Sequence, residues 1–404
     1  MATTKIIETA PLHGIDLTVS DVRLPHQEPA PVRSVAPARL DGSGALAAEP
    51  GATEAISDWR DTADFPVPPR LRPDAEQERA RLSSQSVDIM TALQTAAALN
   101  GTRDRGFQRK TLYATTTGVF RAPSNLPRDL HAGPFTPGAE YRAIVRFANA
   151  ASTAQPDTEP DQRAVGVRIT DDAGRVQDLT FTSGAAGNHA RDAPQFNSTM
   201  KATLRMTGGG LAGRVIAIVG LLLREGPRQT LRLVRARRSA VDSGVSLAAL
   251  RYYSRSPLEM GTKLVHLALL PIDDTAEALV HEARGARDGL GRDLCLRRSE
   301  GDVRFRIAAA EAPGLDDMSR RPRGPWVTVG EITLPRQRTS EAEMLNVAAR
   351  LHGELAMHPF NVWEPGTLVP RGELNEILRG PVYAASARNS GRSDDPPATP
   401  SYGL

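Results

Sequence analysis

Strand-like segments separated by turn residues dominate the sequence between residues 110 and 183. They read TLYATTTGVFRA, YRAIVRFANA and AVGVRITDDAGRVQDLTFTS, each rich in β-branched residues and bounded by Pro, Gly or Asp. The DDAG between two alternating runs predicts a hairpin turn. Further strands are expected at TKLVHLALLPI, DVRFRIAAAEA and WVTVGEITLP. These segments predict an antiparallel sheet, closed or nearly closed into a barrel.

Helical patterns precede, interrupt and follow these strands. The segment 73–101 begins with Pro and Asp, has apolar residues on one face and ends at Asn-Gly, which predicts a helix. Helix is also expected at about 192–240 and from Ser340 to about Ala387. We therefore predict an α+β fold, in which an antiparallel β-barrel carries inserted and C-terminal helices.

Composition divides the chain into three parts. Residues 1–72 are rich in proline and poor in large apolar residues, so we expect a mostly disordered arm. Residues 73–390 form the expected domain, and residues 391–404 form an expected flexible tail.

A net charge of +3 over 404 residues does not indicate a nucleic-acid partner, and a single cysteine excludes an intrachain disulfide. The N-terminal sequence has no secretory pattern, so a cytoplasmic location is expected.

The longest apolar run, VIAIVGLLL at 215–223, is about half as long as a membrane-spanning helix requires, so no transmembrane segment is expected. It is followed by REGPRQTLRLVRARR, in which Arg228, Arg232 and Arg235 recur at helical spacing. The pattern predicts a solvated basic face. The alternative is peripheral contact with anionic lipid.

The stretch ILRGPVYAASARNSGR, residues 377–392, contains an arginine four residues before a tyrosine. On a helix, Arg379 and Tyr383 lie on one face, one turn apart. A cation at that distance favours the phenolate, and tyrosinate is one of the axial ligands that proteins use for haem iron. The ordinary alternative is a C-terminal helix with a half-buried tyrosine and a solvated arginine.

Seven collinear segments between about residue 103 and residue 390 resemble the catalase superfamily, in particular its short branch that lacks added C-terminal domains. They are RGFQRKT; YRAIVRFANA with PDTEPDQRAVGVRI; RDAPQF; YYSRSPLEMG with KLVHLAL; PWVTVGEITLP; MHPFNVWEP; and LNEILRGPVYAASAR. The resemblance implies a haem-binding barrel with haem b as cofactor. It also implies that Tyr383 is the proximal iron ligand and that Arg379 stabilises its phenolate.

The resemblance further implies which cations would bind the two haem propionates. Arg105 and Arg146 are the expected partners, and Arg388 is a weaker third. Arginine suits this task because its guanidinium matches a carboxylate in shape and charge. The alternative is that Arg105 and Arg146 are surface residues beside strands.

The distal side departs from the family pattern. Where the family has a catalytic histidine, this chain has Gln108, or Arg109 if one residue is inserted nearby. An amide can hydrogen-bond a ligand but cannot accept and return a proton near pH 7.

A second distal group of the family, an asparagine, is also missing. Its expected place falls at Ser183 or Gly184. Asn188 and His189 are nearby in the sequence and are alternatives if the loop takes another path, although both are read as ordinary loop residues.

Three functions remain open on this basis. The first is a haem-dependent oxidoreductase that transforms an organic substrate or hydroperoxide by a peroxidase, isomerase or tailoring reaction, as in relatives like allene oxide synthase-like enzymes. The second is a non-catalytic haem-binding protein or pseudoenzyme, and the third is residual catalase or peroxidase activity.

The expected ligand is an organic small molecule or a lipid-like substrate. A homodimer is expected, because arms in this superfamily often wrap a neighbouring subunit.

Overall fold

The computed structural model of the protein describes residues 76–96, 98, 104–183, 190, 192–208, 210–239, 244–273, 275–313, 323–363, 367–372 and 374–392. All of them belong to one compact unit, Leu46–Leu404. The expected arm, 1–72, lies outside the described residues, and so does the expected tail, 391–404, apart from Gly391 and Arg392.

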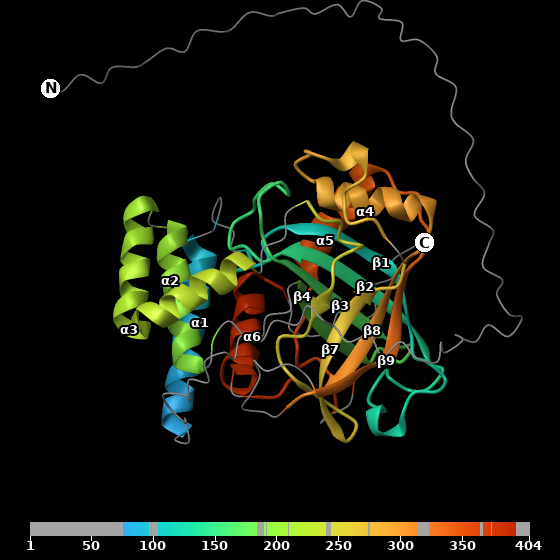
Figure 1. Ribbon diagram of the computed structural model, residues 1–404, viewed down its shortest axis with the longest axis horizontal. Coiled ribbons are helices and arrows are strands. Elements are labelled where there is room, and N and C mark those ends of the chain that lie inside the picture. The colour runs from blue at the N-terminus through green and yellow to red at the C-terminus, as the bar shows by residue number, and fades with distance from the viewer. Residues whose placement is uncertain are drawn as a thin grey trace, which may run out of the picture. The chain divides into compact units, whose positions relative to one another are not determined.

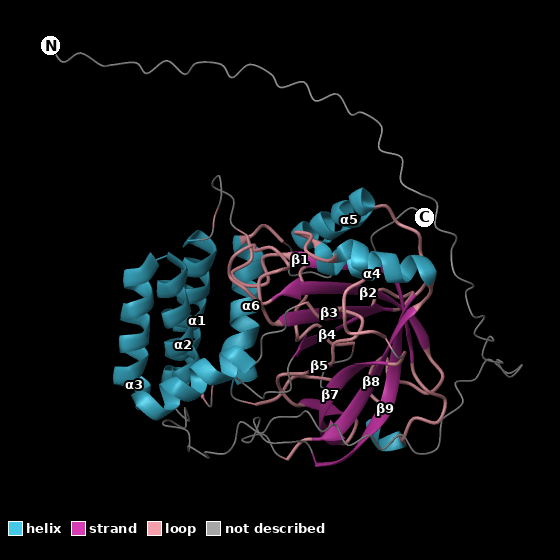
Figure 2. Ribbon diagram, turned by 45° about the horizontal axis from the view of Figure 1, so that its top comes forward, coloured by secondary structure: helices cyan, strands magenta, loops and turns pink. Residues whose placement is uncertain are grey.

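Eight strands close into an antiparallel barrel (Figures 1 and 2). In ring order they are β5 (Tyr252–Tyr253), β4 (Val176–Ser183), β3 (Arg163–Thr170), β2 (Glu140–Asn149), β1 (Thr111–Arg121), β9 (Arg323–Leu334), β8 (Val303–Glu311) and β7 (Lys263–Pro271). The ring closes because the two-residue strand β5 pairs with both β4 and β7. A ninth strand, β6 (Leu258–Met260), pairs with β7. The predicted α+β fold with a closed antiparallel barrel is therefore confirmed.

Alternation along the strands separates the barrel interior from its outer surface. On β2, Val145 and Phe147 belong to the main apolar core, and their partners on β3, Val167 and Val165, belong to the same core. The residues between them point to the opposite face, because successive strand side chains alternate. Arg146 is one of these outward residues, and the site described below is built on this outer surface.

The described helices are α1 (Glu76–Ala96), α2 (Ala193–Gly208), α3 (Gly210–Ser239), α4 (Gly289–Glu300), α5 (Glu341–Glu354) and α6 (Gly380–Asn389), with a π-helical segment η3 (Leu374–Arg379) and short 3-10 turns η1 (Arg128–Leu130) and η2 (His281–Ala283). α1 packs against α2 and α6, and α2 packs against α3. In both ribbon views α6 lies between the barrel and the group formed by α1, α2 and α3. The helix that carries Tyr383 thus has the barrel on one side.

The single C-terminal helix expected from Ser340 to about Ala387 is wrong. Ser340 is the N-cap of α5 and forms a capping box with Glu343, but α5 ends at Glu354. Pro359 and Pro370 then lie in a non-helical stretch, since proline lacks the N–H that a helix interior requires. Among the described residues of this stretch, helical structure returns at Leu374.

His266 on β7 predicts how acid changes the stability of the barrel. The side chain is buried, and burial lowers its pKa to about 4 from an ordinary value near 6.5. The unfolded chain therefore binds a proton below pH 6.5 that the folded chain does not bind until about pH 4. The free energy of unfolding should thus be unaffected by this group above pH 6.5 and fall by about 3 kcal/mol toward pH 4.

Urea unfolding of wild type and His266→Leu at neutral pH and near pH 4 checks this expectation. The variant should lose less stability on acidification than wild type does, because it lacks the titrating ring. The same loss in both proteins would contradict the assignment of this pH dependence to His266.

Candidate functional site

Arg379 and Tyr383 lie together, as their spacing predicts. Arg379 ends η3 and Tyr383 is on α6, one turn later. The Arg379 Nη2 donates to the Tyr383 hydroxyl at 3.4 Å, and the guanidinium carbon is 5.6 Å from the centre of the tyrosine ring. Nη1 donates to Asn375 Oδ1 at 3.0 Å, and Nη2 also reaches Thr180 Oγ1 on β4 at 3.3 Å. The cation is thus fixed against the tyrosine by a residue of its own segment and by the barrel.

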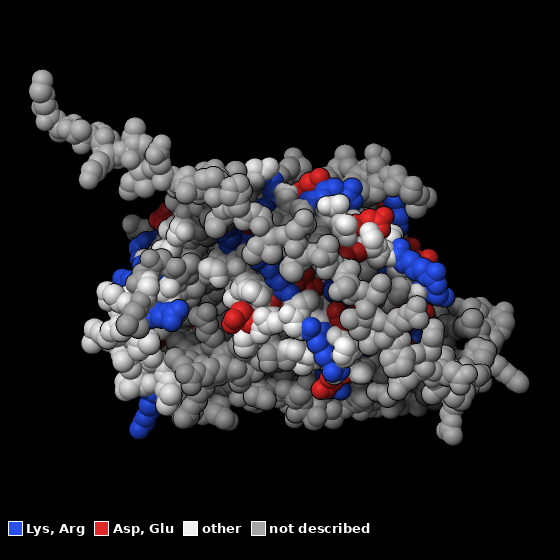
Figure 3. Space-filling model, turned by 90° about the horizontal axis from the view of Figure 1, so that it is seen from above, with Lys and Arg blue, Asp and Glu red and all other residues white. Residues whose placement is uncertain are grey.

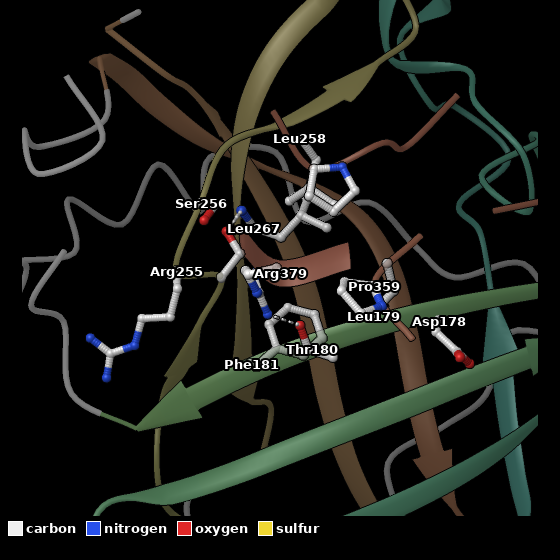
Figure 4. A pocket seen from close by; sticks show the side chains of 12 residues that line it. Asp178, Leu179, Thr180, Phe181, Arg255, Ser256, Leu258, Leu267, Pro359 and Arg379 are labelled. Atoms are coloured by element: carbon white, nitrogen blue, oxygen red, sulfur yellow. Dashed lines mark hydrogen bonds between the residues drawn. The ribbon is translucent and has the colours of Figure 1, made fainter. Parts of the chain in front are cut away.

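A small cavity of about 20 Å³ lies beside Arg379. It is lined by residues of β4, β6 and β7, by the segment after β5, by two proline-containing loops and by Arg379, whose hydrogen bond to Thr180 is drawn in Figure 4. Arg255 also lines the cavity, and burial together with the charge of Arg379 lowers its pKa to about 10. Arg255 therefore stays charged at neutral pH. The surroundings of Arg379 therefore favour an anion, although sequence reasoning did not single out Arg255.

His358 packs edge-on against the tyrosine. The centres of the His358 and Tyr383 rings are 5.7 Å apart at an interplanar angle of 77°. The backbone N–H of His358 donates to Asp178 Oδ2 at 2.9 Å, and that carboxylate forms a buried double hydrogen bond with Arg168 at 2.7 Å on each side. The MHPFNVWEP segment is thereby held on the barrel surface. The sequence flagged this segment, but it did not indicate that its histidine would contact Tyr383.

A cluster of four arginines forms around one carboxylate, Asp104. Arg109 Nη2 and Arg392 Nη1 are each 3.7 Å from Asp104, and Arg105 and Arg146 lie close enough to repel other cations of the cluster electrostatically. Burial, followed by repulsion from Arg392, lowers the pKa of Arg146 to about 10, so this guanidinium remains charged at neutral pH. The four arginines therefore exceed the negative charge of Asp104 by three.

The carboxylate is itself strongly held in its ionised form. Burial alone would raise the pKa of Asp104, but a hydrogen bond from His352 and the charges around it hold that pKa well below its usual range. Burial, opposed by the hydrogen bond with Asp104, lowers the pKa of His352, so its ring is neutral at pH 7. Its Nε2 then donates to Asp104 at 2.9 Å, and its Nδ1 accepts from Thr111 Oγ1 at 3.0 Å. Both nitrogens of this ring are engaged.

Arg146 and Gln108 are locked together. Arg146 donates from Nε to Thr111 Oγ1 at 2.8 Å, from Nη1 to the Gln108 Oε1 at 3.1 Å and from Nη2 to the Gln108 carbonyl at 2.9 Å. Gln108 has a φ of 55°, a left-handed conformation that is uncommon outside glycine. The side-chain oxygen is thus occupied by a cation. The amide Nε2, a donor only, is bonded to no residue within the described parts of the chain.

Tyr383 is close enough to the arginine cluster to interact electrostatically with Arg105 and Arg146. Burial and repulsion between the arginines lower the pKa of Arg105 and Arg146, and a negative charge on Tyr383 would partly oppose both shifts. Arg105 donates from Nη2 to the carbonyls of His352 and Leu355 at 3.0 and 2.5 Å, whereas its buried Nε has no acceptor among the described residues. A buried donor without an acceptor is costly, which marks a place for an anionic ligand atom.

Arg392, which the sequence analysis did not single out, lies in the arginine cluster beside Asp104. Arg388 on α6 is exposed, whereas Arg392 is 7% exposed. Gly391 adopts a left-handed φ of 70°, and the Arg392 N–H returns to the Ala387 carbonyl at 3.0 Å. This turn reverses the chain after α6 and brings Arg392 to the cluster. The sequence feature that indicates this turn is the glycine after the helix, Gly391.

Of the residues that the sequence suggested for the distal side, only Gln108, Arg109 and Ser183 lie in the described part of the chain. Ser183 is fully buried and its hydroxyl accepts from the Arg163 N–H at 2.9 Å, so it is part of the barrel end. Gly184, Asn188 and His189 lie outside the described residues. Gln108 and Arg109 are both present at the cluster, the first bound to Arg146 and the second beside Asp104.

Of the comparisons with known proteins, only the one with solved structures finds similar proteins. No family model matches the sequence, and no curated protein matches it significantly. A solved structure of a bacterial catalase matches with a TM-score of 0.50 at 16% identity, and covers 72% of this chain. A fungal catalase matches with a TM-score of 0.49 at 16% identity, over 71% of this chain. The match spans 57% of the length of each of these two catalases. At this identity the likeness concerns the fold alone, and it shows that the chain has a catalase-like fold.

Proposed function

We propose that the protein binds haem b with Tyr383 as the axial ligand of its iron. The observation that carries the proposal is the excess of buried cations beside a tyrosine that has its own arginine. Haem fits this donor set, because it brings two propionate carboxylates for the arginines and an iron that accepts a phenolate. Arg105, Arg146 and Arg392 are the proposed propionate partners, with Arg388 a weaker one given its exposure.

We further propose that the haem protein acts on an organic hydroperoxide or a related organic substrate. Bound haem would supply the iron redox chemistry at an oxygen–oxygen bond. Gln108 offers an N–H donor that can orient a ligand oxygen, and its own oxygen is held by Arg146. An amide cannot take up a proton and return it near pH 7, and His352 has both ring nitrogens engaged. Efficient disproportionation of H2O2 is therefore not expected.

The test compares two reactions of the haem-loaded full chain. Loss of a fatty-acid hydroperoxide is followed by its diene absorbance, and O2 release from H2O2 is followed with an oxygen electrode. The proposal expects consumption of the organic hydroperoxide with little O2. Vigorous O2 release would overturn it, and inertness toward both substrates would support a non-catalytic haem-binding role instead.

Arg146 provides a prediction for the cofactor site. Arg146→Gln should weaken haem binding about tenfold to a hundredfold, because one charged hydrogen bond to a propionate is lost. The matched control is Arg142→Gln, which changes an exposed arginine four residues earlier on the same strand. Haem titrations followed by absorbance measure both affinities. Equal affinity in the two variants would argue against Arg146 as a propionate partner.

A further inference from the structure

The outward face of α3 is unusually apolar. Seven large aliphatic side chains of this helix are 38–83% exposed, and only two others in the described residues, Ile272 and Leu345, are exposed to a similar degree. The seven are Val215, Ile216, Ile218, Val219, Leu222, Leu223 and Leu231. Exposed apolar surface that is concentrated in one place marks an interaction site.

The spacing of the six residues before the kink at Gly226 makes one continuous stripe. Val215, Val219 and Leu222 recur at helical intervals, so they lie on one side of α3. Ala217 and Leu221 are buried and pack with Ala202 of α2. The stripe therefore faces away from the only helix that α3 packs against closely within the described part of the chain.

Charge is concentrated on the same helical hairpin. Residues 193–239, which form α2 and α3, contain nine basic residues and one acidic residue, a net charge of +8. The whole chain carries +3, so the remainder carries −5. The one acidic residue, Glu225, accepts a hydrogen bond from Gln195 of α2 at 3.0 Å, whereas Arg214, Arg224 and Arg228 are exposed.

α3 also changes character along its length. A kink at Gly226, with φ 80° and ψ 164°, precedes Pro227 and separates an apolar first part from a second part rich in arginine. Figure 3 shows basic side chains at the end of the molecule where α1, α2 and α3 lie, and mixed basic and acidic side chains over the barrel. The hairpin thus joins an aliphatic surface to a cationic one.

We propose that α3 docks on the surface of an anionic lipid bilayer. The aliphatic stripe would enter the boundary of the acyl chains, and the arginines would meet the anionic headgroups. None of the described helices is long and apolar enough to cross a membrane, so the contact is peripheral. A second copy of the chain is disfavoured, because it would bring another hairpin of charge +8 against this one. A nucleic acid is disfavoured as well, because its charged backbone offers no apolar surface to the aliphatic side chains.

The test is co-sedimentation of the full chain with phosphatidylcholine vesicles that contain or lack phosphatidylserine. Wild type should bind the anionic vesicles, and salt should weaken the binding because it screens the arginines. Ile216→Gln combined with Leu223→Gln should reduce the affinity by about a hundredfold or more, because two large aliphatic side chains no longer leave water.

The matched control is Ile272→Gln combined with Leu345→Gln, the two exposed aliphatic residues outside α3. This variant should bind like wild type, and both double variants should keep the thermal stability of wild type. Failure of wild type to bind anionic vesicles, or equal binding by both double variants, would overturn the proposal. Concentration-dependent dimers that the α3 variant abolishes, without vesicle binding, would assign the stripe to a second copy.

Discussion

Replacing Tyr383 with phenylalanine is expected to remove the iron–phenolate bond and to have the largest effect of any single substitution. The change deletes only one oxygen, and the ring can still pack edge-on against His358. The phenolate charge-transfer absorption of the haem-loaded protein should disappear. Haem affinity should fall as well, because only the propionate partners would hold the cofactor.

The matched control is Tyr141→Phe, which removes the same oxygen from a tyrosine whose ring packs in the barrel against Trp363 and Phe120. It should retain the wild-type spectrum and affinity. If Tyr383→Phe also retained the phenolate absorption, another residue would be the ligand and the proposed cofactor site would fail.

Replacing Gln108 with histidine should raise the release of O2 from H2O2. The imidazole would supply a group that can accept and return a proton, a service worth roughly 10²- to 10⁴-fold in general acid–base catalysis. The gain should be smaller than this, because the partner asparagine is missing and groups that act together are not additive. Histidine tolerates the left-handed backbone at this position better than most residues do.

Gln108→Asn is the control, since it keeps an amide and adds no base. Its O2 release should stay at the wild-type level, and Gln108→His should lose organic-hydroperoxide turnover if the glutamine orients that substrate. High O2 release by wild type, or no gain in Gln108→His, would contradict this account of Gln108.

The barrel could be predicted because most of its strands have clear patterns. β1 to β4 and β7 to β9 match the segments that alternation and turn residues indicated, except for up to three residues at the start of β2, β3 and β9, and they carry the apolar core. The strand β5 could not be predicted, because two residues are too few to show a period. Tyr252 and Tyr253 nevertheless close the ring, since their pairing partners on β4 and β7 are set by the whole barrel.

The candidate site was predictable where spacing along one helix decides the contact. Arg379 and Tyr383 are one turn apart, and this local geometry places the guanidinium beside the ring. Arg392 and His358 were not predictable in the same way. The first depends on the left-handed turn at Gly391, and the second on a loop anchored by the buried pair Arg168 and Asp178. Both contacts depend on tertiary structure, which local sequence patterns indicate only weakly.

Titration of the full chain with haem, followed by absorbance and by resonance Raman spectroscopy, tests whether Tyr383 binds haem iron. We expect saturation at one haem per chain and phenolate vibrations that are enhanced on excitation into the charge-transfer band. These vibrations should vanish in Tyr383→Phe and persist in Tyr141→Phe. Haem binding without phenolate vibrations, or no saturable binding, would contradict the ligation of haem iron by Tyr383.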